Sequence, residues 1–304
     1  MKMHFKSKHF ELQKLKDGIY AAIAKDGGGS VGNAGFVDLG DQTIVFDTFN
    51  TQQAAEDLQH FAESITGQSV TWVINSHWHG DHVRGNQIFK DSHIISSSTT
   101  YQKMKELHPE RIAKQKNDIK GLLQFIESLI EKNDIGLENQ IRFLKEIATS
   151  LPSLELVLPH QTFNSKVMFH GSKRQAELFT LGGGHSFCDA ILYLPDDKVI
   201  FMGDLLFVDT HPSLFEESNP ENWIRILNEA KKMEIDIAVP GHGPVGAKHD
   251  MKSLMNYINK ITTLVKENRN LDELSIPPKF QKWSASENFI RNLKLLKENS
   301  QGIN

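Results

Sequence analysis

Apolar positions divide the chain into short strand-like runs and longer helical ones. In residues 18–47, short apolar stretches are separated by tight turns, which predicts a meander of strands. In residues 51–65 the apolar side chains recur every three or four positions, and this period predicts an amphipathic helix. The uninterrupted apolar run at 70–74 predicts a buried strand.

The middle of the chain is expected to be helical, and strands are expected to return after it. Residues 101–150 carry two apolar stripes at helical spacing, separated by a break at 133–139. They predict a helical hairpin inserted between two halves of the fold. Further strand-like runs lie at 93–96, 154–158, 166–169, 176–181, 190–194, 199–202 and 236–239, with helices at 220–233 and about 248–300.

These elements form two successive runs, each rich in strands first and in helices afterwards. Such a chain buries its apolar faces best as two packed β-sheets with helices outside, which places it in the α/β (α+β) class. No Gly/Ser-rich or Pro-rich linker marks a boundary. We therefore expect residues 1–304 to form one domain, with the insertion at about 101–150.

Composition restricts the partners and the compartment. A net charge of −4 with interspersed signs gives no general attraction to nucleic acid or to anionic lipid, so neither is expected as a partner. No apolar run approaches the roughly 20 residues of a membrane span, and none follows the first lysines as a secretory signal would require. Cys188 is the only cysteine, so no intrachain disulfide forms. The cytoplasm is the expected location.

Residues that carry chemistry are concentrated directly after the 70–74 strand, in Ser76-His77-Trp78-His79-Gly80-Asp81-His82. Side chains two residues apart face the same side of an extended backbone, so His77 and His79 can converge on one ion. Asp81 and His82 can turn toward a second ion at Gly80. Imidazole and carboxylate ligands suit Zn²⁺, and iron or manganese would also fit. The simpler alternative is a polar loop whose histidines only form hydrogen bonds.

Three further polar residues follow strand-like runs in the same way. His185 comes after glycines 182–184, whose small size lets the backbone pass close to a metal. Asp204 follows the apolar run 199–202, where a buried carboxylate needs a positive partner. His242 lies between two glycines after the 236–239 run. Each alone could be a turn or cap residue, but four such strand ends in series predict one shared site.

The order of these motifs, HxHxDH, GxxH, GD and GHG, resembles the metallo-β-lactamase superfamily over residues 18–244. The resemblance implies a four-layer αββα sandwich with two metal ions, here expected to be Zn²⁺, at one edge of its two mixed sheets. Carried over residue by residue, it assigns His77, His79 and His185 to the first ion, Asp81, His82 and His242 to the second, and Asp204 to both.

Neighbouring positions indicate a branch of this family. Its best-known β-lactamases have arginine, cysteine and lysine where this chain has His82, Asp204 and Phe207. The ligand set therefore resembles that of hydroxyacylglutathione hydrolases and lactonases. Phe207 would leave the carboxylate of a β-lactam without its usual cation.

The expected activity is a metal-dependent hydrolysis of a small-molecule thioester, lactone or ester. A bound metal lowers the pKa of its water from about 16 to about 7, and Asp81 is expected to orient the resulting hydroxide. A mononuclear iron oxygenase acting on sulfur compounds is a competing hypothesis, but it would leave His82 and His242 without a metal. A phosphodiesterase of the same fold and a metal-free binding module are two further hypotheses.

Several residues are expected to support the site rather than to bind metal. Asp47 and Asp189 are candidates to accept the remaining N–H of a ligating histidine, although either could be a turn residue. Trp78 is expected to pack in the core. The insertion would pack on the body, cover the metal edge or form the contact of a homodimer.

Overall fold

The computed structural model describes residues 6–301, and the strands of this part form two β-sheets. The first sheet has seven strands in chain order: β1 (Phe10–Lys16), β2 (Ile19–Ala24), β3 (Ala34–Asp38), β4 (Thr43–Phe46), β5 (Trp72–Ile74), β6 (His93–Ser97) and β7 (Gln161–Phe163). The second sheet has the order β12-β11-β10-β9-β8, from β8 (Lys166–His170), β9 (Gln175–Thr180), β10 (Ala190–Leu194), β11 (Val199–Phe201) and β12 (Ile237–Val239).

Both sheets are mixed. Strands β1 to β4 pair antiparallel, whereas β4 to β7 are parallel. In the second sheet β8 to β11 pair antiparallel, and β12 is parallel to β11. Because parallel strands end at the same edge of a sheet, the segments that follow β4 and β5 lie together, as do those that follow β11 and β12.

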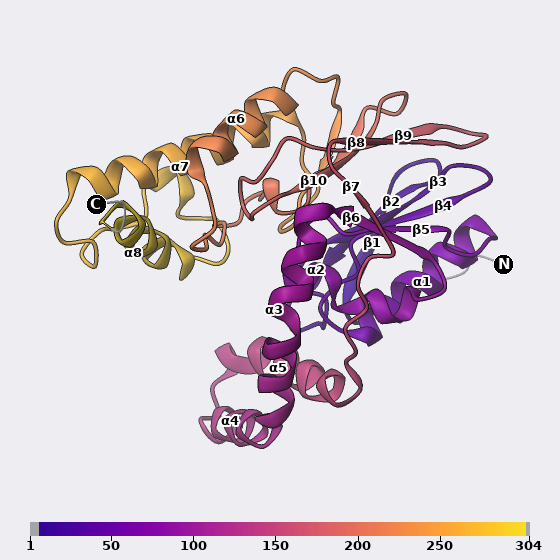
Figure 1. Ribbon diagram of the computed structural model, residues 1–304. Helices are drawn as coiled ribbons and strands as arrows, with labels where there is room; N and C mark the ends of the chain where they lie inside the picture. Colours follow the sequence, from indigo (N-terminus) through magenta and orange to yellow (C-terminus); the bar gives the residue numbers. More distant parts are fainter. Residues whose placement is uncertain (1–5, 302–304) are drawn as a thin grey trace.

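The two sheets pack face to face with helices on both outer faces (Figure 1). An apolar core that includes Ile44, Ile74, Leu192 and Phe201 fills the space between the sheets. Helix α1 (Gln52–Thr66) buries its apolar side on the first sheet, and helices α6 (Pro220–Ala230) and α7 (Lys248–Glu267) cover the second. The predicted αββα sandwich is therefore confirmed.

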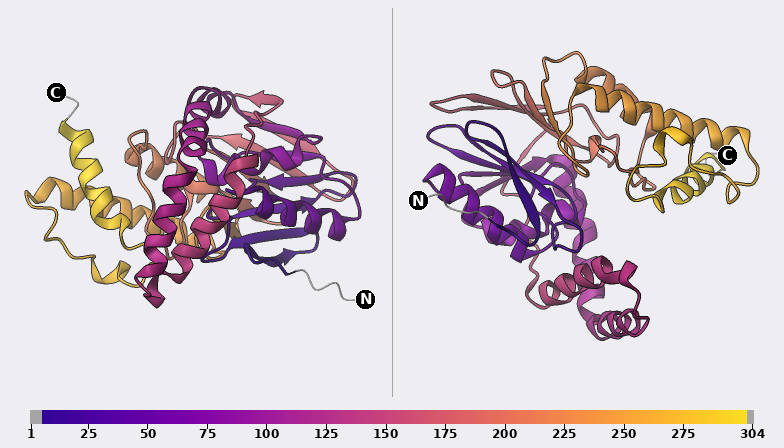
Figure 2. Two further views of the ribbon diagram at one scale, coloured as in Figure 1. Left: turned by 90° about the horizontal axis from the view of Figure 1, so that it is seen from below. Right: turned by 180° about the vertical axis from the view of Figure 1, so that it is seen from behind.

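Two helical lobes extend beyond the same end of the sandwich (Figure 2). The insertion forms the first lobe, with α3 (Ser98–Asn117), α4 (Ile119–Glu131) and α5 (Glu138–Ser150). Helix α7 and the final helix α8 (Asn288–Gln301) form the second, and α2 (Gly80–Val83) is a single turn. None of the helices within residues 6–301 combines the length and the hydropathy that crossing a bilayer requires.

Two predicted elements differ from the structure, and one strand was not predicted. The strand predicted at 154–158 is wrong, because this segment has no regular secondary structure and the chain forms β7 a few residues later. Strand β1 was not predicted, since it is an edge strand with a mostly polar, partly exposed sequence. The insertion contains three helices rather than a hairpin, because the helical chain breaks at Asp118. That residues 1–304 form one domain stays a prediction.

Candidate metal centre

The four predicted segments meet at one edge of the sandwich. The segment after β5 carries His77 and His79 in a loop and Asp81 and His82 in helix α2. The loop between β9 and β10 carries His185, and the segments after β11 and β12 carry Asp204 and His242. The two sheets are joined here, because Ala190 N–H donates to the carbonyl of Ser76 over 2.8 Å. Ligands from both sheets are thus held at a shared seam.

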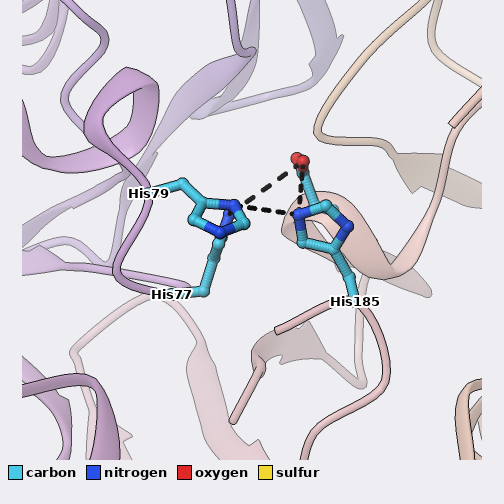
Figure 3. Close-up of side chains that lie close together, drawn as sticks. His77, His79 and His185 are labelled. Carbon is cyan, nitrogen blue, oxygen red and sulfur yellow. Dashed lines mark hydrogen bonds and ion pairs between the residues drawn. The ribbon is translucent and has the colours of Figure 1, made fainter. Parts of the chain in front are cut away.

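Three histidines point toward one another in the first group (Figure 3). His79 Nδ1 lies 3.0 Å from His77 Nε2 and 3.0 Å from His185 Nε2. Asp204 Oδ2 completes the group, 3.1 Å from His185 Nε2 and 4.0 Å from His77 Nε2. The group is buried.

The second group contains Asp81, His82 and His242. Asp81 Oδ2 lies 3.5 Å from His82 Nε2 and 3.4 Å from His242 Nε2. Asp204 also faces this group, with Oδ1 3.0 Å from His82 Nε2 and Oδ2 3.3 Å from His242 Nε2. All seven predicted side chains therefore come together, and the Asp204 carboxylate faces both groups.

The contacts within the cluster fit shared cations better than hydrogen bonds. His79 Nδ1 has either one proton to donate or one lone pair to accept with. It therefore cannot form a good hydrogen bond with both His77 Nε2 and His185 Nε2. Zinc–nitrogen bonds of about 2.0–2.1 Å in a tetrahedral site would separate neighbouring ligand nitrogens by roughly 3.3 Å, close to the observed spacing. In addition, His82 Nε2 and Asp204 Oδ1 are buried, face each other, and have no hydrogen-bond partner within residues 6–301. The donor set of imidazoles and carboxylates fits a divalent metal ion.

Burial and neighbouring charges set the protonation of the cluster. Burial lowers the pKa of His77 well below its usual value and that of His185 to about 3, so both are neutral at pH 7. Burial raises the pKa of Asp81 and Asp204, but the adjacent histidines outweigh it and hold both carboxyls well below their usual range. Neutral imidazoles and ionised carboxylates are the forms that bind a metal, so His77 and His185 are already in the binding form. Burial lowers the pKa of His82 and His242, but the adjacent carboxylates outweigh it and raise the first well above its usual value and the second to about 9, so these two rings would release a proton when a metal binds.

Asp47 supports the cluster from the end of β4, as the sequence predicted. Its carboxylate is buried and accepts from His82 Nδ1 over 2.8 Å and from the Ser76 N–H and hydroxyl, each over 2.7 Å. The first of these bonds leaves His82 Nε2 to face the cluster. Asp47 has φ 61°, in the left-handed region that aspartate tolerates better than most residues.

Asp189 accepts no hydrogen bond from a histidine ring of residues 6–301. Its carboxylate accepts from the backbone N–H groups of Gly184, His185 and Ser186 and from the Ser186 hydroxyl. It therefore fixes the backbone that carries His185 and supports the site in a different way from the predicted one.

Glu217 is a supporting residue that the sequence did not reveal. Its Oε1 lies 3.0 Å from His79 Nε2, so a proton on that nitrogen can be donated to the carboxylate while Nδ1 faces the cluster. Glu217 belongs to the loop between β11 and α6, beside a second glutamate, Glu216. Only the folded structure distinguishes the two.

Close backbone approaches and aromatic rings complete the site. A Cβ on Gly241 would overlap Asp204 Oδ1, which explains why a glycine precedes His242. Phe207 stacks on the His242 ring, with centroids 5.1 Å apart and planes 11° apart. Trp78 is buried as predicted, and its carbonyl accepts from His108 Nε2 of α3 over 2.6 Å.

Comparisons with known proteins agree with this architecture. The family model described as the metallo-β-lactamase superfamily matches residues 27–242. A metallo-β-lactamase from Pontibacter korlensis has a similar structure, with a TM-score of 0.61, 17% identity and coverage of 83% of this chain and 99% of that chain. The DIM-1 metallo-β-lactamase gives a TM-score of 0.58 at 18% identity, over 83% of this chain and 98% of its own. No curated protein sequence matches the chain.

At 17% and 18% identity, the similarity to these two solved structures shows the fold alone. The family model covers well over half of the chain and contains all seven clustered residues. The two-sheet architecture, the strand-end cluster and this match lead to one conclusion: the chain belongs to the metallo-β-lactamase superfamily.

Proposed function

We propose that this protein is a dinuclear zinc-dependent hydrolase that acts on a thioester, lactone or ester. The observation that carries the proposal is the pair of ligand groups that share Asp204, whose two oxygens face histidines of both groups at 3.0–3.3 Å. His82 and His242 would be surplus in a site for one ion.

The residues divide the work in the proposed site. His77, His79 and His185 would hold one ion, Asp81, His82 and His242 the other, and Asp204 both. When bound, such a pair supplies a nucleophile from water at neutral pH and polarises the substrate carbonyl. Asp81 is partly exposed, and its carboxylate would orient the attacking water and accept its proton. Asp47 and Glu217 would keep the rings of His82 and His79 in the binding orientation.

The wall beside His242 supports an ester-type substrate over a β-lactam. Phe207 lies flat on the His242 ring and offers no charge to a carboxylate at this position. Phe207 is only 3% exposed and packs in the core, so this position gives the substrate no cation.

Metal analysis of the purified full chain tests the number of ions. We expect two equivalents of zinc in the wild type and one in His242→Gln, because that variant loses a ligand of the second group only. His170→Gln, an exposed histidine outside the cluster, is the matched control and should keep both. One equivalent of iron with oxygen consumption would instead support the oxygenase.

A substrate panel tests the reaction. Zinc-loaded protein should hydrolyse at least one thioester, lactone or carboxylic ester, and His242→Gln should lose most of this activity while His170→Gln retains it. Turnover of phosphodiesters alone would replace the proposal by a phosphodiesterase function.

A further inference from the structure

A cavity of about 670 Å³ adjoins the candidate metal centre, between α3 of the insertion and α8 near the end of the chain. Its lining includes Phe215, whose ring centroid lies 4.5 Å from that of His79, and Glu217, which is bonded to the same histidine. The volume is that of a typical small-molecule pocket. In Figure 1 the two helices belong to separate lobes that flank this end of the sandwich.

Two arginines face this cavity with their charges unused. The Arg111 guanidinium lies 4.5 Å above the Trp78 ring, and that of Arg291 lies 5.3 Å from the Phe215 ring. Both rings contact His79, at centroid distances of 4.7 and 4.5 Å. Both arginines are exposed, and neither guanidinium forms an ion pair or a hydrogen bond with another residue between 6 and 301. Each guanidinium is therefore held on an aromatic platform beside the site with its donors free.

The remaining charges of the lining limit what these arginines can bind. The third cation, Lys294, is paired with Asp272 over 2.7 Å. Glu216, Glu287 and Glu298 also line the cavity and have no cationic partner within the described chain. These acids would repel a group with several negative charges, such as a phosphate chain. A single negative charge would be attracted by the two guanidiniums of the lining and repelled less strongly by these acids.

We propose that Arg111 and Arg291 bind one carboxylate of the substrate, so that the protein hydrolyses esters or thioesters of dicarboxylic acids. The planar guanidinium matches a carboxylate with two parallel hydrogen bonds, which makes arginine suited to this group. The proposal rests on the proposed hydrolase function and specifies its substrate class. The two arginines would determine specificity without touching the reacting carbonyl.

A series of matched esters tests the proposal. Thioesters of succinate, glutarate and adipate are compared with their neutral monomethyl counterparts on zinc-loaded full-length protein. At least one chain length should show kcat/KM about tenfold higher for the free carboxylate. The double variant Arg111→Gln and Arg291→Gln should bring this ratio close to one. Lys279→Gln, a lysine over the Phe280 ring outside the cavity, is the matched control and should leave the ratio unchanged.

Binding of glutarate itself gives a readout that does not need turnover. Trp78 lies under Arg111, so glutarate should change the tryptophan fluorescence of the as-purified full chain, and the double variant should bind it about tenfold more weakly. Direct binding of glutarate to a metal would be equal in both proteins, so the difference reports the arginines.

The outcomes separate the two proposals. Equal ratios and equal glutarate binding in wild type and double variant would overturn the carboxylate site, even if esters are hydrolysed. A preference for phosphate-tailed over carboxylate-tailed thioesters would also overturn it. If no ester is hydrolysed but glutarate binding depends on the arginines, the carboxylate site stands and the hydrolase function fails.

Discussion

His108 makes the stability of this protein sensitive to acid. The ring is buried on α3, and its Nε2–H donates to the Trp78 carbonyl over 2.6 Å, while Nδ1 is buried without a hydrogen-bond partner in residues 6–301. Protonation would place a charged N–H where nothing accepts it. Burial accordingly lowers the pKa of His108 from 6.5 to about 4.

The direction and size of the effect follow from linkage. The folded form binds the proton more weakly than the unfolded form, so the stabilisation is fully present above pH 6.5 and is lost as the pH falls toward 4. At 1.36 kcal/mol per pKa unit the full effect is about 3 kcal/mol. Between pH 8 and pH 5, the unfolded state gains about 2 kcal/mol from protonation of this one ring.

Urea unfolding of the wild type and His108→Gln at pH 8 and pH 5 measures this contribution. Glutamine keeps a donor for the Trp78 carbonyl but cannot be protonated. The wild type should lose about 2 kcal/mol more free energy of unfolding than the variant between the two pH values. The other titrating groups are common to both proteins, and a chelator removes any effect of metal. The exposed His170→Gln variant should behave as the wild type. Equal losses in wild type and His108→Gln would refute the reasoning.

Three other substitutions test the supporting residues of the site. Glu217→Gln should weaken zinc binding about 10- to 100-fold, measured in competition with a chromogenic chelator, because the amide holds the His79 ring less firmly than the carboxylate does. Glu216→Gln is the control and should bind zinc as the wild type does. Equal zinc affinities of Glu217→Gln and the wild type would contradict the supporting role of Glu217. In Asp47→Asn, asparagine can adopt the same backbone conformation, but the charge-assisted hydrogen bonds to His82 and Ser76 are lost. Thermal unfolding should therefore show a destabilisation of about 2–4 kcal/mol. A change smaller than the error of the fit would contradict the supporting role of Asp47. Gly241→Ala should displace the Asp204 carboxylate, so metal analysis should find less than two equivalents of zinc; full occupancy would show that the loop can shift.

Local sequence carried enough information to find the cluster. Each of four cluster residues follows an apolar run: His77, His185, Asp204 and His242. A residue that comes shortly after a buried strand lies at the edge of the sheet. The chemistry of the side chains and their place in the strand pattern therefore sufficed to bring them together. The prediction for Asp47 succeeded for the same reason.

Other features depend on contacts that the local pattern does not contain. Glu217 acts because its loop folds back onto His79, and Glu216 has the same local sequence signal without that contact. Arg111 and Arg291 lie 180 residues apart and meet only because two helical lobes flank the same end of the sandwich. Strand β1 was not predicted for a related reason. Its sequence is mostly polar, and it is a strand because it pairs with β2.

The seam between the two sheets has a consequence for the chain as a whole. His79 and His185, which belong to the same ligand group, are separated by 106 positions (185 − 79), and the long helical insertion lies between them. A cation bound by both imidazoles would close this large loop, and closing a long loop removes much conformational freedom from the unfolded chain. Loss of the metal would then destabilise both sheets together, although the metal would be bound at only one edge of the sandwich.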